Sequence, residues 1–312
     1  MFKLFYKLVI LFLAFILVDF LLGFTLDSII DKSPDGRYFK AQYSLEKSKE
    51  DIMIFGASRA ECHIAPSIIE KSLKLSCWNA GRGNQTLPFW ISMAEGILKR
   101  HTPKLAILDI EADYLSSGLS ASYEPSAGML RPFYREHKEI RPMINKVSIF
   151  EQYFNYSKLY AYNSSYYYLL RPYLIKGLDG KLEDKGWKPV TGQMQPDNST
   201  PTIIDTKRVL NKETVKLFNE FISSFTKKGC PVFIVVSPRF NEIIKNTSTL
   251  DYIRNMKNVY LVNFKDNIVF SKDYRNFRDE SHLNKEAAIK FTNVLVEKMI
   301  RMNIDSIVEQ NK

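Results

Sequence analysis

The sequence predicts an α/β fold in which about five parallel strands form a three-layer, doubly wound sheet. Short apolar runs of strand length alternate with stretches of helical spacing, and the first two of these runs end at glycines. This alternation is typical of a parallel sheet covered by helices on both faces. Of the 312 residues, 45% are hydrophobic and 25% are charged, which excludes a disordered or low-complexity protein and allows a large core.

The chain begins with an apolar segment, residues 1–30, that we expect to be a transmembrane helix and membrane anchor. From Leu8 to Leu26 the run is almost wholly apolar, and as a helix its roughly 19 residues would span about 28 Å, enough for a hydrocarbon core. Lys3 and Lys7 precede the run, so the positive-inside rule places the rest of the chain on the outer side. A cleaved signal peptide is the alternative, although no small-x-small cleavage site follows.

Asp19 interrupts this apolar segment, and a carboxylate inside a bilayer is costly. It would either contact another membrane protein or lie shallow enough to reach the outer interface. Residues 31–50, which are polar and charged, are expected to form a tether between the anchor and the folded domain.

Residues 51–113 are expected to form the first part of the sheet domain. In chain order, the pattern predicts a strand at 52–55, a helix at about 66–74, a strand at 76–79, a helix at 87–100 and a strand at 105–110. In a parallel sheet, ligands bind at the carboxyl ends of the strands.

Residues 207–303 are expected to form the second part of that domain, followed by a tail at 304–312. The predicted elements are a helix at 212–228, a strand at 231–236, a helix around Leu250, a strand at 259–262 and an amphipathic helix at 284–301. In the last of these, Ala288, Phe291, Leu295 and Met299 form one apolar stripe.

An aromatic-rich insert, residues 114–206, separates the two parts. It is too long for a loop and lacks the strand–helix rhythm of its flanks. Clustered tyrosines suit sugar or polymer binding, and the alternative is a helical subdomain that buries its aromatic rings against the sheet. The tyrosines concerned are Tyr153, Tyr156, Tyr160, Tyr162, Tyr166, Tyr167, Tyr168 and Tyr173.

Charge and cysteine usage limit the function classes. Lys and Arg number 44 against 34 Asp and Glu, but no basic run reaches the length of a nucleic-acid-binding arm, so a nucleic-acid partner is not expected. The net charge of +10 indicates a solvated basic surface or attraction to anionic lipid or polymer. Cys62, Cys77 and Cys230 leave open one disulfide, Cys62–Cys77, or three buried thiols, and they show no metal-ligand spacing.

Three residues have the pattern of a nucleophilic triad. Ser58 directly follows the first strand, where Gly56 permits a sharp turn, although a serine there could simply cap a helix. Asp279 and His282 are separated by two residues in a loop that leaves the same edge of the sheet. Asp279 would hold the imidazole of His282, which would take the proton from Ser58.

The glycine-rich loop after the second strand is a candidate for oxyanion stabilisation. Gly83 allows a close approach of backbone amides, and Asn84 adds a side-chain amide, although a plain strand-to-helix turn has the same composition. Arg59, beside the nucleophile, could bind a substrate carboxylate or form a structural ion pair with Asp113 or Glu111. No metal-binding or dinucleotide-binding pattern is evident, so neither a metal nor another cofactor is expected.

The order of these motifs resembles the SGNH/GDSL hydrolase superfamily, which has a flavodoxin-like sheet. The resemblance rests on strand–GxS, strand–NxG, a third strand, strand–SP and DxxHLN before a last amphipathic helix, and it covers residues 51–110 and 232–300. It is closest to membrane-anchored, envelope-facing members associated with acyl transfer to cell-surface polymers. It implies that Ser58 is the nucleophile and that Asp279 and His282 complete the triad.

The third motif departs from the family pattern. Where the family has G-x-N-D, this chain has Glu111-Ala112-Asp113-Tyr114, and an aspartate at the asparagine position cannot donate a hydrogen bond unless protonated. Asp113 therefore stands in the predicted site where a donor should be, and Asn84 is the expected replacement.

Together these features predict an esterase or O-acyltransferase acting on an envelope or extracellular polysaccharide through an acyl-Ser58 intermediate. The resemblance implies an acyl donor, a glycan or polymer acceptor and a multi-span membrane acyltransferase as a candidate partner. It also implies a bacterial cytoplasmic membrane with the domain on the outer, periplasmic or extracytoplasmic side. The altered third motif favours the alternative, a non-catalytic glycan-binding or scaffold protein.

Overall fold

The structure is a computed structural model that describes residues 2–33, 35–163, 165–175, 184–196, 199–262 and 267–310. At its centre lies a five-stranded, wholly parallel sheet in the order β2-β1-β3-β5-β7. The strands are β1 (Ile52–Gly56), β2 (Cys77–Asn79), β3 (Leu105–Asp109), β5 (Val232–Val235) and β7 (Val259–Leu261). The predicted α/β class and the five predicted strands are therefore confirmed.

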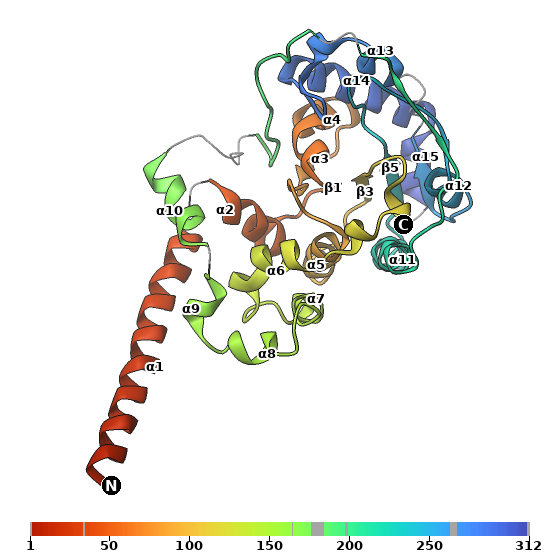
Figure 1. The fold of residues 1–312 in the computed structure, drawn as a ribbon. Coiled ribbons are helices and arrows are strands. Elements are labelled where there is room, and N and C mark those ends of the chain that lie inside the picture. Colours follow the sequence, from red (N-terminus) through yellow and green to blue (C-terminus); the bar gives the residue numbers. More distant parts are fainter. Residues whose placement is uncertain are drawn as a thin grey trace.

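Helices cover both faces of the sheet, because alternate side chains of each strand point to opposite sides. Met53 and Phe55 belong to one core cluster, with α5 (Leu87–Leu98) and α11 (Lys212–Thr226), as Figure 1 shows below the sheet. Ile52 and Ile54 belong to the other. That cluster includes apolar residues of α3 (Ser58–His63), α4 (Pro66–Leu73) and α14 (Lys285–Arg301).

Several short elements were not predicted from the pattern. They are α3, α13 (Asn267–Ser271), the parallel pair β4 (Thr202–Thr206) and β6 (Glu242–Thr247), and the hairpin β8 (Phe277–Asp279) and β9 (His282–Leu283). The helix predicted around Leu250 is present as α12 (Ser248–Arg254). The predicted tail contains α15 (Ile304–Gln310), whose Ile304 is buried in the second core cluster; residues 311 and 312 lie outside the described residues.

The long first helix, α1 (Phe2–Asp31), projects away from the domain (Figure 1). Among the described residues it is the one helix long and apolar enough to cross a membrane. The segment after it differs from the expected tether. It forms α2 (Arg37–Gln42) and a π-helical turn, η1 (Tyr43–Lys47), because Tyr38 and Leu45 join the core and the polar groups between them find partners inside the protein.

The insert is built from short helices. These are η2 (Tyr114–Ser116), η3 (Gly118–Ala121), α6 (Glu124–Leu130), η4 (Arg131–Phe133), η5 (Lys138–Ile140), α7 (Arg141–Ile144), α8 (Glu151–Phe154), α9 (Lys158–Ala161) and α10 (Tyr166–Leu174). The interpretation that the insert buries its aromatic rings holds for Tyr114, Phe133 and Tyr134, which belong to the first core cluster, but not for most of the clustered tyrosines. Of the eight tyrosines, only Tyr162 is buried and Tyr160 is partly exposed, whereas the other six are exposed.

Asp19 has partners within its own chain. Its carboxylate accepts hydrogen bonds from the Ser157 hydroxyl (2.5 Å) and from the backbone amides of Lys158 (2.8 Å) and Leu159 (3.1 Å) at the start of α9. The contact therefore joins the anchor helix to the insert. The three cysteines are buried free thiols, so the Cys62–Cys77 pair is not formed.

Candidate active site

Ser58 is the first residue of α3, immediately beyond the carboxyl end of β1. Gly56 makes the turn with φ +138°, and a Cβ there would lie 2.7 Å from both the Ala60 Cβ and the Asp109 carbonyl oxygen. Only glycine fits that position without strain. The backbone amides of the first turn of a helix have no intrahelical acceptor, so they remain available beside the Ser58 hydroxyl.

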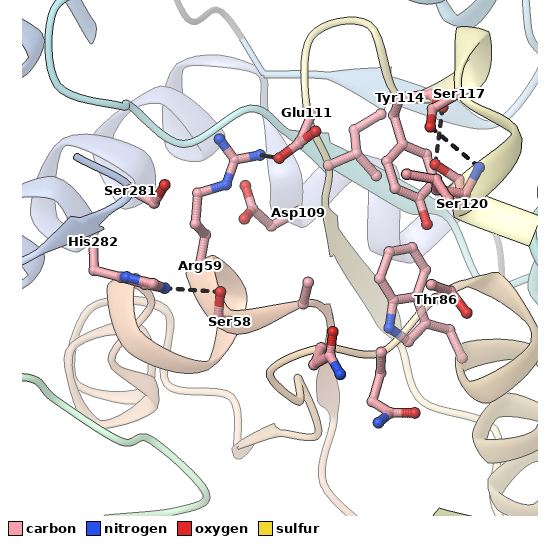
Figure 2. Close-up of a pocket in the computed structure, with 16 residues that line it drawn as sticks. Ser58, Arg59, Thr86, Asp109, Glu111, Tyr114, Ser117, Ser120, Ser281 and His282 are labelled. Atoms are coloured by element: carbon pink, nitrogen blue, oxygen red, sulfur yellow. Dashed lines mark hydrogen bonds and ion pairs between the residues drawn. The ribbon is translucent and has the colours of Figure 1, made fainter. Parts of the chain in front are cut away.

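The β8–β9 hairpin brings His282 to Ser58 across 224 residues of sequence. Figure 2 shows the imidazole directed at the serine, with Nε2 2.8 Å from the Ser58 Oγ. The other ring nitrogen, Nδ1, lies 2.9 Å and 3.0 Å from the two carboxylate oxygens of Asp279. The three predicted triad residues thus form one continuous chain of hydrogen bonds.

The Asp279 carboxylate is held in place by more than the imidazole. It also accepts hydrogen bonds from the backbone amides of Ser281 (2.9 Å) and His282 (3.0 Å). Partial burial raises the pKa of Asp279, but these donors and the imidazole outweigh it, so the pKa lies below its ordinary value. The carboxylate is therefore ionised at neutral pH and can orient and stabilise a protonated imidazole.

A second histidine, His63, packs beside the triad. Its ring lies edge-on to His282 with 6.2 Å between centroids, and its Nε2 accepts the backbone N–H of Leu283 (2.9 Å). Burial, Arg59 and His282 hold the pKa of His63 well below its ordinary value. His63 is thus neutral, and it fixes the strand that carries His282 without competing for the proton.

A buried charged cluster of Lys40, Glu61 and Arg82 lies behind the nucleophile and was not predicted. Glu61 is on α3, three residues after Ser58, and accepts the Gly83 amide (2.8 Å), with Lys40 and Arg82 each 3.4 Å away. Burial opposes ionisation of Glu61, but the two cations hold its pKa below the ordinary value. Lys40 also donates to the Gly81 carbonyl (2.5 Å), so the cluster fastens the glycine-rich loop to α3.

Of the residues predicted to form the oxyanion site, one lines the pocket and the others lie outside it. Asn84 lines the pocket and adopts a left-handed backbone conformation, φ +59°. Gly83 lies beside Ser58, but its amide donates to Glu61 instead of facing the pocket. Asp113 does not line the pocket, because the chain turns after β3 and its carboxylate pairs with Arg208 at 2.7 Å.

Glu111, rather than Asp113, enters the pocket from the segment after β3. Arg59, which is 7% exposed, lines the same pocket and lies 3.8 Å from Glu111, as Figure 2 shows. Its other terminal nitrogen donates to the Ser237 carbonyl (3.4 Å). Asp109, at the end of β3, accepts the amide (2.9 Å) and hydroxyl (3.0 Å) of Ser237, and burial raises its pKa.

The pocket that contains Ser58 and His282 has a volume of about 500 Å³. Away from the triad it is lined by Gln85 and Trp90, which are 3% and 1% exposed. Within the described residues, neither polar atom of the Gln85 amide has a hydrogen-bond partner, and nor does the Trp90 indole nitrogen. Buried polar groups normally have partners, so these three atoms are an exception behind the pocket wall.

The arrangement can activate a serine for nucleophilic attack next to a pocket that has both polar and aromatic surface. In the parts of the chain that the structure describes, no three His, Cys, Asp or Glu side chains are grouped so as to hold a metal ion. A scan against protein-family models finds no matching family, and a search of curated proteins finds no similar sequence.

Proposed function

We propose that this chain is an SGNH-type serine acyl-transfer enzyme that works through an acyl-Ser58 intermediate. The observation that carries the proposal is the continuous Asp279–His282–Ser58 chain, with 2.9 Å and 2.8 Å between successive partners. The strand order β2-β1-β3-β5-β7, which is the flavodoxin-like order, supports an SGNH-type fold. Ser58 also lies at the carboxyl edge of the sheet, where such folds bind ligands.

In the proposed reaction, the Ser58 oxygen bonds to the acyl carbon of an ester while its proton moves to His282 Nε2. The carbonyl oxygen gains the negative charge, and its proposed donors are the backbone amides at the start of α3 and the side chain of Asn84, which lines the pocket. The leaving oxygen departs as a hydroxyl and takes the proton from His282. Water or a sugar hydroxyl then repeats the sequence in reverse, giving hydrolysis or transfer.

The setting supports a substrate at a cell envelope. We propose a cytoplasmic-membrane anchor at α1, with the domain on the outer side and a glycan or other polymer as acyl acceptor. The pocket is lined by hydroxyl side chains, such as those of Thr86 and Ser117, together with the aromatic Tyr114, and this combination suits a polyhydroxylated ligand. A multi-span acyl donor protein remains part of the proposal on the family resemblance alone, because Asp19 is satisfied by α9 and gives it no support.

Covalent labelling of the full chain with a fluorophosphonate probe tests the chemistry without knowledge of the substrate. Wild type is expected to label, and both Ser58→Ala and His282→Ala are expected to lose more than about 100-fold in labelling rate. Ser223→Ala, on the exposed face of α11 and remote from the pocket, is the matched serine control and should label like wild type. Labelling that survives in Ser58→Ala, or a folded wild type that does not label, contradicts the proposal.

The second candidate is a glycan-binding or scaffold protein that has kept the fold, and the carboxylate of Glu111 in the pocket favours it. A negative charge there would oppose a developing oxyanion. Under this alternative, a soluble polysaccharide fragment binds equally well to wild type and Ser58→Ala, and the Ser58→Ala variant complements a deletion strain. Loss of complementation with unchanged glycan binding would favour the enzyme.

A further inference from the structure

Exposed apolar side chains are concentrated in one part of the insert. Between residues 149 and 175, large aromatic and aliphatic residues on and around α8 and α10 face outward, among them Phe150 (53% exposed), Phe154 (50%) and Leu174 (76%). Elsewhere in the described domain such residues are scattered singly, as at Val209 and Val269. A concentrated apolar surface of this kind marks a binding face for a membrane or a protein.

This part of the insert is fastened to the outer half of α1. The Asp19 carboxylate caps the start of α9, and the Lys158 stem packs so closely on Gly23 that a Cβ there would lie 2.1 Å from the Lys158 Cβ. The Lys158 ammonium pairs with Asp27 and lies 5.5 Å from the centre of the Phe20 ring. Tyr173 on α10 donates to the Ile29 carbonyl (2.6 Å).

These contacts determine how deep the insert would lie in a bilayer that α1 crosses. The apolar run of α1 ends at Leu26, so Asp19 lies about 10 Å back along the helix axis from that end. If α1 crosses a bilayer along its apolar run, the start of α9 lies below the outer boundary of the hydrocarbon layer. The aromatic residues that flank α9 then lie at the depth where membrane proteins concentrate tyrosine and other amphipathic rings.

A groove between α1 and α10 continues the same surface. It has a volume of about 420 Å³ and is lined by Phe24, Thr25, Ile29, Leu170 and Tyr173, with Lys32 among its lining residues. An apolar channel with a lysine beside it matches a lipid, whose acyl chain would lie along the channel and whose anionic headgroup would meet the ammonium.

We propose that the segment 149–175 is embedded in the outer leaflet beside α1 and binds bilayer lipid through the exposed faces of α8 and α10. Lipid is the occupant that the geometry favours, because this surface is continuous with the lipid-facing surface of α1. In Figure 1, α8 and α9 lie on the side of the domain from which α1 projects. The protein is thus held at two points, which fixes the orientation of the catalytic domain against the bilayer.

Spin-label accessibility of the full chain in lipid nanodiscs tests this. The native thiols are all buried, so single cysteines can be introduced and labelled at chosen sites. Labels at Phe154→Cys and Leu174→Cys are expected to collide with lipid-soluble oxygen severalfold more, relative to a water-soluble nickel chelate, than a label at Val209→Cys. A label at Leu13→Cys, on the exposed surface of α1, gives the value for lipid, and circular dichroism checks each fold.

The proposal is overturned if labels at 154 and 174 behave like the one at 209 while the label at 13 reports lipid. If the label at 13 also reports water, α1 lies outside the bilayer, and the proposal is overturned because its membrane anchor is absent. Protection of the labels at 154 and 174 from both oxygen and nickel would also overturn it, because this surface would then be buried against protein, such as a second copy of this chain. None of these outcomes depends on the acyl-transfer chemistry, which the fluorophosphonate experiment measures separately.

Discussion

The sheet domain and the insert use aromatic side chains in opposite ways. Around the sheet, Phe55, Trp78 and Phe221 are at most 1% exposed and pack on one another or on neighbouring strands and helices. In the insert, Tyr153 and Tyr156 are 61% and 80% exposed. The residues around the sheet therefore form an apolar core, to which Leu130 and Phe133 of the insert also contribute, whereas residues 149–175 of the insert present apolar surface that only another phase or molecule can cover.

The two regions are alike in how they use buried charge. Beside the sheet, Glu61 holds the glycine-rich loop against α3. In the insert, the carboxylate of Glu151 accepts the Arg131 guanidinium at 2.6 Å and 3.1 Å and the Tyr160 hydroxyl at 3.0 Å. Each carboxylate holds neighbouring groups in place, the glycine-rich loop in one case and the Tyr160 ring in the other, and breaking either pair would leave an uncompensated charge.

Alanine substitutions in the two regions should differ most clearly in how much they lower the free energy of unfolding. Phe221→Ala removes a buried ring whose centroid lies 5.3 Å from that of the Phe55 ring. It is expected to lower the free energy of unfolding by about 3–5 kcal/mol. Tyr156→Ala is expected to change it by less than about 0.5 kcal/mol, since the side chain is exposed. Denaturant unfolding in detergent micelles, where no bilayer covers the insert, measures both. Equal losses would show that the insert surface is buried in the protein itself.

The pocket side of the comparison can be sharpened at Asn84. Asn84→Gly keeps the left-handed backbone accessible while it removes the side-chain amide, and we expect a 10- to 100-fold slower fluorophosphonate reaction. Tyr156→Ala in the insert, which is remote from the pocket residues, should react at the wild-type rate. An unchanged rate in Asn84→Gly would remove Asn84 from the set of oxyanion donors.

Lys40 lies at the junction of the two regions. Its titration should change the free energy of unfolding with pH, and this is the smallest of the expected effects. Burial lowers the pKa of Lys40 from 10.5 to about 8, even though Glu61 acts to raise it. Between those two values the unfolded chain binds more protons at this residue than the folded one, so the contribution of Lys40 to the free energy of unfolding should rise with pH, by about 2 kcal/mol. Burial raises the pKa of Cys62, Cys77 and Cys230, whose titration changes the free energy of unfolding in the opposite direction, so the rise is the difference between wild type and a Lys40 variant.

Denaturant midpoints at pH 7.5 and pH 10 measure this rise. In Lys40→Met the contribution of this group should be absent, and Lys216→Met, on the exposed surface of α11, is the matched control that should follow wild type. If wild type and Lys40→Met show the same pH dependence, the Lys40 ammonium is not the group that titrates.

Much of the sheet and the triad could be read from local pattern. Apolar runs of strand length at 52–55 and 105–110 need no distant information, because a strand buried on both faces is apolar throughout. The spacing of Asp279 and His282 likewise predicts their contact, since a short hairpin joins them. The pairing with Ser58 followed from both segments leaving the same edge of a parallel sheet.

The misplaced residues share a physical cause, which is that they depend on contacts far away in sequence. Asp113 and Glu111 both follow β3, and only the turn at η2 and the position of Arg208 decide which carboxylate faces the pocket. The residues at 31–50 have a polar sequence typical of a tether, yet Glu61 and Gly81 provide partners that let Lys40 be buried. Polar composition predicts exposure only where no such partner exists.

The sequence by itself determined the α/β class, the long apolar helix and the residues with the chemistry of a triad. Local propensity and periodicity are properties of short segments, so they could be read without coordinates. Only the tertiary structure decided that Asp19 caps α9, that Glu61 takes the Gly83 amide, and that six of the eight clustered tyrosines of the insert face outward. Those outcomes depend on which donors and surfaces meet in space, and neither composition nor spacing determines that.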